Sequence, residues 1–295
     1  MKNLAIKILT DSACDIPFDA KLENVEIMNF HINIEGRDCE ERVDYTMEQF
    51  YDILEGCESI PTTAHITMID FFEKYCQLAS EGVTDVIHVT INKGASATHD
   101  AALMGRQMFY DENPNSHMTI TVVDSRCYSV GYGYPVMCAD KMVSDGASAG
   151  EIIEYLEERF EKNEILLGTY SLKFMKKSGR ISAAAAFAGE LMGFRPVILM
   201  KHGKTDVLQK ARGDRMLIPA LVAKMAERTA DRQDYVVGYT ADIEARDELV
   251  KACTEAMGYP PKLVCHLGSA VSINAGPHSI GVMYLGREQT RAVHC

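Results

Sequence analysis

Hydroxyl-bearing side chains gather in four loops of this 295-residue chain, where a strand is expected to lead into a helix. The loops are Thr10–Ser12, Ser59–Thr67, Asn92–Thr98 and Asp124–Ser125. In parallel α/β sheets such loops lie at the carboxyl ends of the strands, where ligands bind. Hydroxyls, free backbone N–H groups and the positive end of a helix can together hold an anion such as a carboxylate.

Several of these hydroxyls are expected to cap helices rather than to bind a ligand. A side-chain oxygen just before a helix accepts a hydrogen bond from an unpaired N–H group of the first turn. We predict this role for Thr67, Ser125 and Ser12. Thr63 and Ser96 are the better ligand candidates, because each lies in a loop with small neighbours next to the expected start of a helix.

Short apolar, β-branched runs alternate with amphipathic helical patterns in the first half of the chain. The expected strands span residues 5–9, 85–91 and 118–123, and residues 25–34 are a second apolar, β-branched region. The expected helices span 46–54, 67–81, 99–109, 134–144 and 149–161. This order predicts an α/β fold in which helices cover both faces of a mostly parallel sheet.

A second α/β unit with a mixed sheet is expected after this one. Its strands are predicted at residues 165–169, 196–201, 235–239, 262–267 and 280–285, and its helices at 216–231 and 243–258. A length of 295 residues exceeds one ordinary core, so we predict two domains, a three-layer domain over 1–163 and a second over 164–295.

Composition excludes several classes of function. The formal net charge of −12 argues against nucleic acid and anionic membranes as partners. No apolar run approaches the roughly 18 residues of a spanning helix, and the first residues do not resemble a signal peptide, so we expect a cytoplasmic protein without stable membrane insertion. The nine cysteines are scattered and the histidines show no ligand-like spacing, so we expect free thiols and no metal site.

Three segments of the second half admit more than one interpretation. The basic run 176–182 is either a solvated surface or part of a site, in a chain that is otherwise acidic. The apolar run 189–200 is either ordinary core or the wall of a pocket, since methionine adapts to irregular shapes. Residues 274–278 are expected to form a loop before the last strand.

Seven short motifs, taken in order, resemble those of the DegV family over nearly the whole chain. They are Thr10–Pro17 (TDSACDIP), Thr63–Thr67 (TAHIT), Ser96–Thr98 (SAT), Val123–Ser125 (VDS), Ser178–Ile181 (SGRI), Lys210–Arg212 (KAR) and Gly276–Pro277. The resemblance implies a bacterial, two-domain lipid carrier that buries a long-chain fatty acid. It also implies no catalytic residue and no cofactor, and delivery of the acid to a separate fatty acid kinase.

The same resemblance assigns the site residues. Thr63 and Ser96 would hydrogen-bond the fatty-acid carboxylate. The complete implied carboxylate site comprises Thr62, Thr63, His65, Ser96, Ala97 and Asn274, with Arg180 and Thr98 near it and Arg212 near the surface that faces the kinase.

Two departures from the family pattern fall on this site. Asn274 stands where the family has a histidine, and Ala64 and His65 stand where it has serine and glutamine. Asparagine can donate a hydrogen bond but cannot carry a positive charge. We hypothesise that His65 supplies an imidazole from the opposite loop.

Two other functions compete with the carrier interpretation. A hydrolase or acyltransferase would use Ser96 with His65 or His99, although the chain lacks a G-x-S-x-G elbow. A phosphate or nucleotide binder is the weakest candidate, since neither a P-loop nor a G-x-G-x-x-G motif is present.

Overall fold

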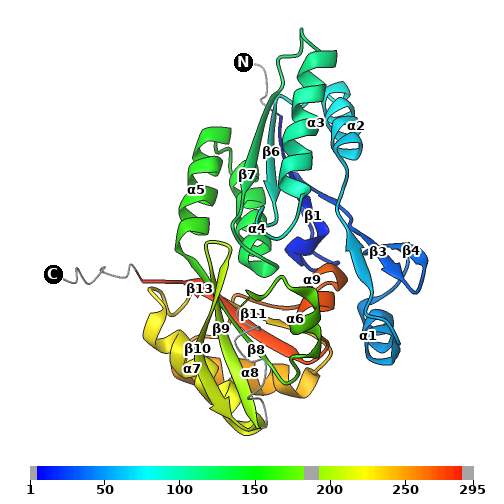
Figure 1. Ribbon diagram of the computed structural model, residues 1–295. Coiled ribbons are helices and arrows are strands. Elements are labelled where there is room, and N and C mark those ends of the chain that lie inside the picture. The colour runs from blue at the N-terminus through cyan, green and yellow to red at the C-terminus, as the bar shows by residue number, and fades with distance from the viewer. Residues whose placement is uncertain (1–4, 183–192, 288–295) are drawn as a thin grey trace, which may run out of the picture.

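The computed structural model describes residues 5–182 and 193–287 (Figure 1). These residues form a four-stranded sheet, a three-stranded sheet and a six-stranded sheet. The four- and three-stranded sheets belong to the N-terminal half, residues 5–162, and the six-stranded sheet belongs to the C-terminal half, from residue 163 on.

The four-stranded sheet is parallel throughout, as predicted, with the order β2-β1-β6-β7. Its strands are β1 (Ile6–Asp11), β2 (Val25–Met28), β6 (Asp85–Thr90) and β7 (Thr119–Asp124). Five of the six residues of β6 are buried, which is why its sequence, DVIHVT, is apolar on both faces rather than alternating.

Helices cover both faces of this sheet (Figure 1). One face carries α2 (Met68–Ser80) and α3 (Thr98–Glu112), and the other carries α4 (Val130–Ser144) and α5 (Ala149–Lys162). The predicted cap at Thr67 is confirmed, because its side chain accepts a hydrogen bond from the Asp70 N–H group and completes a capping box.

The three-stranded sheet was not predicted. It has the order β4-β3-β5, with β3 (His31–Ile34), β4 (Arg37–Glu40) and β5 (Thr62–Ala64), and it lies beside α1 (Met47–Gly56). The apolar, β-branched region 25–34 therefore holds two strands, β2 and β3, because the chain changes sheets near Phe30. The Phe30 N–H group donates to Ser12 Oγ (2.9 Å) and its carbonyl accepts from Glu41 N (3.0 Å), which fixes that break.

The six-stranded sheet is mixed, also as predicted. Its order is β10-β9-β8-β13-β11-β12, and only the β11–β12 pair is parallel. The strands are β8 (Asn163–Thr169), β9 (Phe194–Lys201), β10 (Lys204–Arg212), β11 (Tyr235–Tyr239), β12 (Leu263–His266) and β13 (Ser279–Leu285).

Helices α7 (Leu217–Arg228) and α8 (Ile243–Met257) pack on one face of this sheet. The short helices α6 (Lys173–Ser178) and α9 (Ser269–Ala275) lie between its other face and the N-terminal half (Figure 1). Two short 3-10 turns, η1 (Ser12–Cys14) and η3 (Asp214–Met216), complete the described elements.

The loop predicted over residues 274–278 is wrong at its start, because Asn274 lies in the last turn of α9. The start of α9 is fixed by a carboxylate from the N-terminal half. Glu41 Oε1 accepts hydrogen bonds from Ser269 Oγ (2.6 Å) and Ala270 N (2.9 Å). Local sequence patterns could not predict this contact, because the two residues are 228 positions apart.

Two buried carboxylates hold the halves together. Glu41, 1% exposed, also accepts from Ser12 Oγ at 2.5 Å. Asp15, 3% exposed, accepts from Gly268 N (2.8 Å) and from Ser129 Oγ (2.5 Å). Ser12 is therefore a donor within this junction and not a helix cap, contrary to prediction.

Other expectations concern the whole chain. A bilayer-spanning helix is not found among residues 5–182 and 193–287. Eight cysteines are free thiols, while Cys295 lies outside the described residues. The division into domains 1–163 and 164–295 stays a prediction, since Phe174, Ala270 and Ile273 pack into the core of the N-terminal half.

Replacing Glu41 by alanine is expected to lower the free energy of unfolding by about 2–5 kcal/mol, because buried donors lose their acceptor. Urea titration of the purified variant measures this loss. Glu157→Ala, which removes an exposed carboxylate from α5, should change stability by less than about 0.5 kcal/mol. Equal stability of the two variants would contradict a structural role for Glu41.

Candidate functional site

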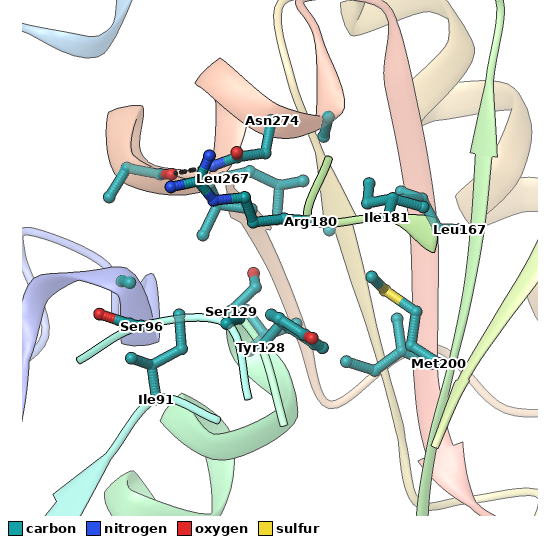
Figure 2. A pocket seen from close by; sticks show the side chains of 18 of the residues that line it. Ile91, Ser96, Tyr128, Ser129, Leu167, Arg180, Ile181, Met200, Leu267 and Asn274 are labelled. Atoms are coloured by element: carbon teal, nitrogen blue, oxygen red, sulfur yellow. Dashed lines mark hydrogen bonds between the residues drawn. The ribbon is translucent and has the colours of Figure 1, made fainter. Parts of the chain in front are cut away.

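A cavity of about 310 Å³ lies between the two halves (Figure 2). This volume is at the small end of the range of about 300–1,000 Å³ that small-molecule sites occupy. The lining comes from the loops after β5 and β6, the start of α4, the segment after α6, helix α9, and strands β8, β9, β11 and β13.

Six of the nine predicted site residues line this cavity. They are Thr63, His65, Ser96, Ala97, Arg180 and Asn274. They come from four separate segments, so the fold brings together residues that are more than 200 positions apart. Among the described residues of the lining there is no aspartate or glutamate, and Arg180 is the one permanently charged side chain.

Ser96 and Ala97 form the turn that leads into α3. Ser96 Oγ bonds Thr98 Oγ1 (2.8 Å) and accepts from the Thr98 N–H group (3.3 Å). Within the described part of the chain, the N–H groups of Ser96 and Ala97 donate to no protein acceptor. The amino-terminal end of a fifteen-residue helix, with two free N–H groups, therefore borders the cavity.

Arg180 faces the cavity from the segment after α6. Gly179 ends that helix with a φ of +69°, which turns the chain toward the cavity. One guanidinium nitrogen donates to the Ser178 carbonyl (2.8 Å), and among the described carboxylates none pairs with Arg180. Figure 2 shows its side chain reaching across the cavity toward Asn274.

Asn274 projects from the last turn of α9. Its amide nitrogen donates one hydrogen bond to the Ala270 carbonyl (2.9 Å), the dashed line in Figure 2. The amide has two N–H groups, so one is left to donate toward the cavity. A neutral donor thus occupies the position where the family resemblance places a histidine.

Three predicted residues are not among those that line the cavity. Alternation along β5 places Thr63 toward the cavity and exposes Thr62. Thr98 is buried and bonds Ser96, so it positions that hydroxyl. Arg212 is exposed at the end of β10. Contacts of these residues with a ligand or a partner stay predictions.

The opposite side of the cavity is apolar. Figure 2 shows Leu167 and Met200 across from Ser96 and Asn274. Residues that our sequence analysis did not name contribute much of the lining, including Ile91, Tyr128, Ser129, Ile165, Leu267 and Met283. Met200 belongs to the apolar run 189–200, whose residues 189–192 lie outside the described residues.

The first and fourth hydroxyl-bearing loops do not line the cavity, contrary to expectation. Thr10, Asp11 and Ser12 are buried in β1 and η1. Asp11 accepts hydrogen bonds from Ile91 N (2.9 Å) and Tyr132 OH (2.5 Å), so it holds the end of β6 against α4. Ser125 Oγ accepts from Cys127 N (3.1 Å) in a turn and caps no helix.

The geometry does not support a serine nucleophile. Ser96 Oγ bonds a threonine, and His99 Nδ1 bonds Thr90 Oγ1 (3.0 Å) away from the cavity. Burial lowers the pKa of His99. A nucleophile needs a base within hydrogen-bond reach, and the described residues provide none for Ser96. They also contain no cluster of three or more metal-ligating side chains.

Comparison with models of protein families shows to which family the chain belongs. The model described as "Uncharacterised protein, DegV family" matches residues 5–287. The chain belongs to the DegV family. A Clostridium perfringens DegV domain-containing protein is 27% identical over 285 residues, 95% of this chain and 99% of that protein. A Thermotoga maritima protein named fatty acid-binding protein is 26% identical over 94% of this chain and 96% of its own length.

Solved structures share the DegV fold along nearly their whole length. A fatty-acid-binding DegV family protein from Thermus thermophilus aligns with a TM-score of 0.83 and 26% identity, covering 96% of this chain and all of that one. The fatty acid kinase B3 protein of Streptococcus pneumoniae, loaded with linoleic acid, aligns with a TM-score of 0.81 over 95% of this chain and 99% of its own. At 19% identity, the latter supports the fold alone.

The buried Asp11 of this DegV chain should make the stability of the folded state depend on pH. Burial raises its pKa from 3.8 to about 6, although its bonds to Tyr132 and Ile91 oppose the rise. The folded state therefore binds the proton more tightly, so the Asp11 contribution to stability is present below pH 4 and is lost as the pH rises through 6. At about 1.4 kcal/mol per pKa unit the loss amounts to about 3 kcal/mol.

We expect the unfolding free energy of the wild type, minus that of Asp11→Asn, to fall by this amount between pH 4 and neutral pH. Urea titrations at several pH values measure the difference. Asp52→Asn, at an exposed position of α1, should follow the wild type at every pH. A pH-independent difference for Asp11→Asn would contradict the assignment.

Proposed function

We propose that this chain binds a long-chain fatty acid in the cavity between its halves. The carboxylate would lie among Thr63, Ser96, Ala97, Asn274 and Arg180, and the hydrocarbon chain would extend toward the six-stranded sheet. The observation that carries this proposal is the polarity of the lining. The described residues of the lining place donors and one cation on one side and aliphatic side chains on the other, and they include no carboxylate.

The polar side meets the needs of a buried carboxylate, which is costly to desolvate unless hydrogen bonds or a cation compensate it. The free N–H groups of Ser96 and Ala97 and the start of α3 supply donors and a positive potential. Arg180 supplies a formal charge that no described carboxylate neutralises. A neutral or cationic headgroup would gain nothing from this arrangement.

The apolar side provides the driving force. Burying about fourteen methylenes offers on the order of 11 kcal/mol, at about 0.8 kcal/mol each. Loss of the free motion of the acid and ordering of its chain offset a large part of this. The remainder is enough for a complex that survives purification.

The chain acts, in this proposal, as a carrier that presents the acid to a separate fatty acid kinase. The DegV resemblance and the names of its Thermus and Thermotoga relatives support the carrier role. The kinase partner rests on the family resemblance. Ser96 lacks a base, which supports binding without catalysis.

The direct test is solvent extraction of the purified, denatured protein followed by mass spectrometry. A stoichiometric long-chain acid is the expected result. A blank, repeated after incubation with fatty acids, would exclude the proposal. A phosphate-bearing molecule in the extract would favour the nucleotide-binding alternative.

Arg180→Ala should weaken binding of a fatty acid by about 1–2 kcal/mol, or roughly 5- to 30-fold in Kd, because the carboxylate loses its charged partner. Displacement of a fluorescent fatty acid measures the change. Arg212→Ala removes an exposed arginine that does not line the cavity, and it should keep the wild-type affinity. Equal effects of the two changes would show that Arg180 acts only through net charge.

His65 lines the cavity from an exposed position after β5. If it supplies the imidazole that Asn274 lacks, His65→Ala should weaken fatty-acid binding several-fold. His117→Ala, on the exposed loop before β7, should not. Unchanged affinity in His65→Ala would leave the carboxylate to the hydroxyls, the helix end and Arg180.

A further inference from the structure

Two glycines lie opposite each other on neighbouring strands under the cavity. Gly238 of β11 and Gly281 of β13 are directly paired in antiparallel register, and both line the cavity. Leu167 of β8 pairs with Gly281 from the other side and also lines the cavity. A row of three cavity-facing positions thus crosses the sheet, and two of them have no side chain.

Glycine in the interior of a strand is unfavourable, because it gives up packing and backbone entropy. The next pair on the same face of these strands is Val236 and Met283, both fully buried and both bulky. The sheet surface is therefore lower at Gly238 and Gly281 than at Val236 and Met283, and the Leu267 side chain packs over Gly238. This depression is local, and it extends the cavity on its apolar side.

A methyl group added at either position would enter the cavity wall. A Cβ on Gly238 would lie 2.9 Å from Leu267 Cδ2, the flexible end of another lining side chain. A Cβ on Gly281 would lie 3.0 Å from the Leu166 carbonyl oxygen, which is part of the backbone and cannot yield as easily. Gly238 is the position where a methyl group can be accommodated with the smaller rearrangement.

The glycine pair lies away from the proposed carboxylate site. The polar lining comes from the loops before α2 and α3 and from α9, whereas the glycines belong to β11 and β13 of the six-stranded sheet. In Figure 2, Leu167, which neighbours Gly281, is on the far side of the cavity from Ser96. An acid held by its carboxylate on the polar side would extend its chain toward this depression.

We propose that the Gly238–Gly281 pair receives the methyl end of the bound fatty acid and sets the longest chain that fits. This inference rests on the proposed function. Protein interiors are close-packed, so one methyl group added to the floor should shorten the longest acid that fits by about one methylene. Leu167 is the adjacent wall, and shortening it should have the opposite effect.

The test compares myristate, palmitate and stearate by displacement, together with the chain lengths that co-purify. Gly238→Ala should shift the preference to shorter acids and lower the ratio of stearate to myristate affinity by about fourfold for each methylene that no longer fits. Leu167→Ala should raise that ratio. Gly150→Ala, where the added methyl group in α5 meets nothing within 4 Å, should leave it unchanged.

Circular dichroism and melting temperatures show whether each variant is folded, and Leu167→Ala keeps the test informative if Gly238→Ala does not fold. Unaltered chain-length ratios in folded Gly238→Ala or Leu167→Ala would overturn the inference. That outcome differs from failure of the proposed function, in which the wild type itself binds no fatty acid.

Discussion

The buried carboxylates Asp15 and Glu41 determine how the two halves meet. Together they accept hydrogen bonds from Gly268, Ser269 and Ala270, which are the residues that begin α9. This places a short helix, too short to be stable alone, in one orientation between two sheets. Since α9 carries Asn274 and other residues that line the cavity, the Asp15 and Glu41 network fixes one wall of the cavity.

The cavity is a product of this junction rather than of either sheet. The parallel sheet contributes polar loops at the carboxyl ends of its strands, while the mixed sheet contributes residues of β8, β9, β11 and β13 from its apolar face. Ser129 belongs to both systems, because it lines the cavity and donates to Asp15. A ligand that fills the cavity therefore stabilises the contact between the halves.

Sequence patterns predicted the helices and strands well where hydrophobic periodicity and capping residues determine them. The apolar β6, the capped α2 and the amphipathic α5 occur as expected. The hairpin strands β4 and β10 were missed because their sequences, RDCE and KTDVLQKAR, are largely polar and exposed. Thr63, Ser96 and Arg180 were found through motifs, but Gly238 and Gly281 were not, since their meaning depends on a strand pairing that sequence does not display.

Glu41 and Ser269 are separated by 228 residues, which has a consequence for biosynthesis. At about 5–20 residues per second, the ribosome takes roughly 10–50 s to pass from one to the other. During that interval the two carboxylates lack their donors from the start of α9, because Gly268, Ser269 and Ala270 have not yet been synthesised. Completion of the cavity is thus a late event of translation, because a chain that stops before Gly268 carries Thr63, Ser96 and Arg180 but lacks α9 and β13.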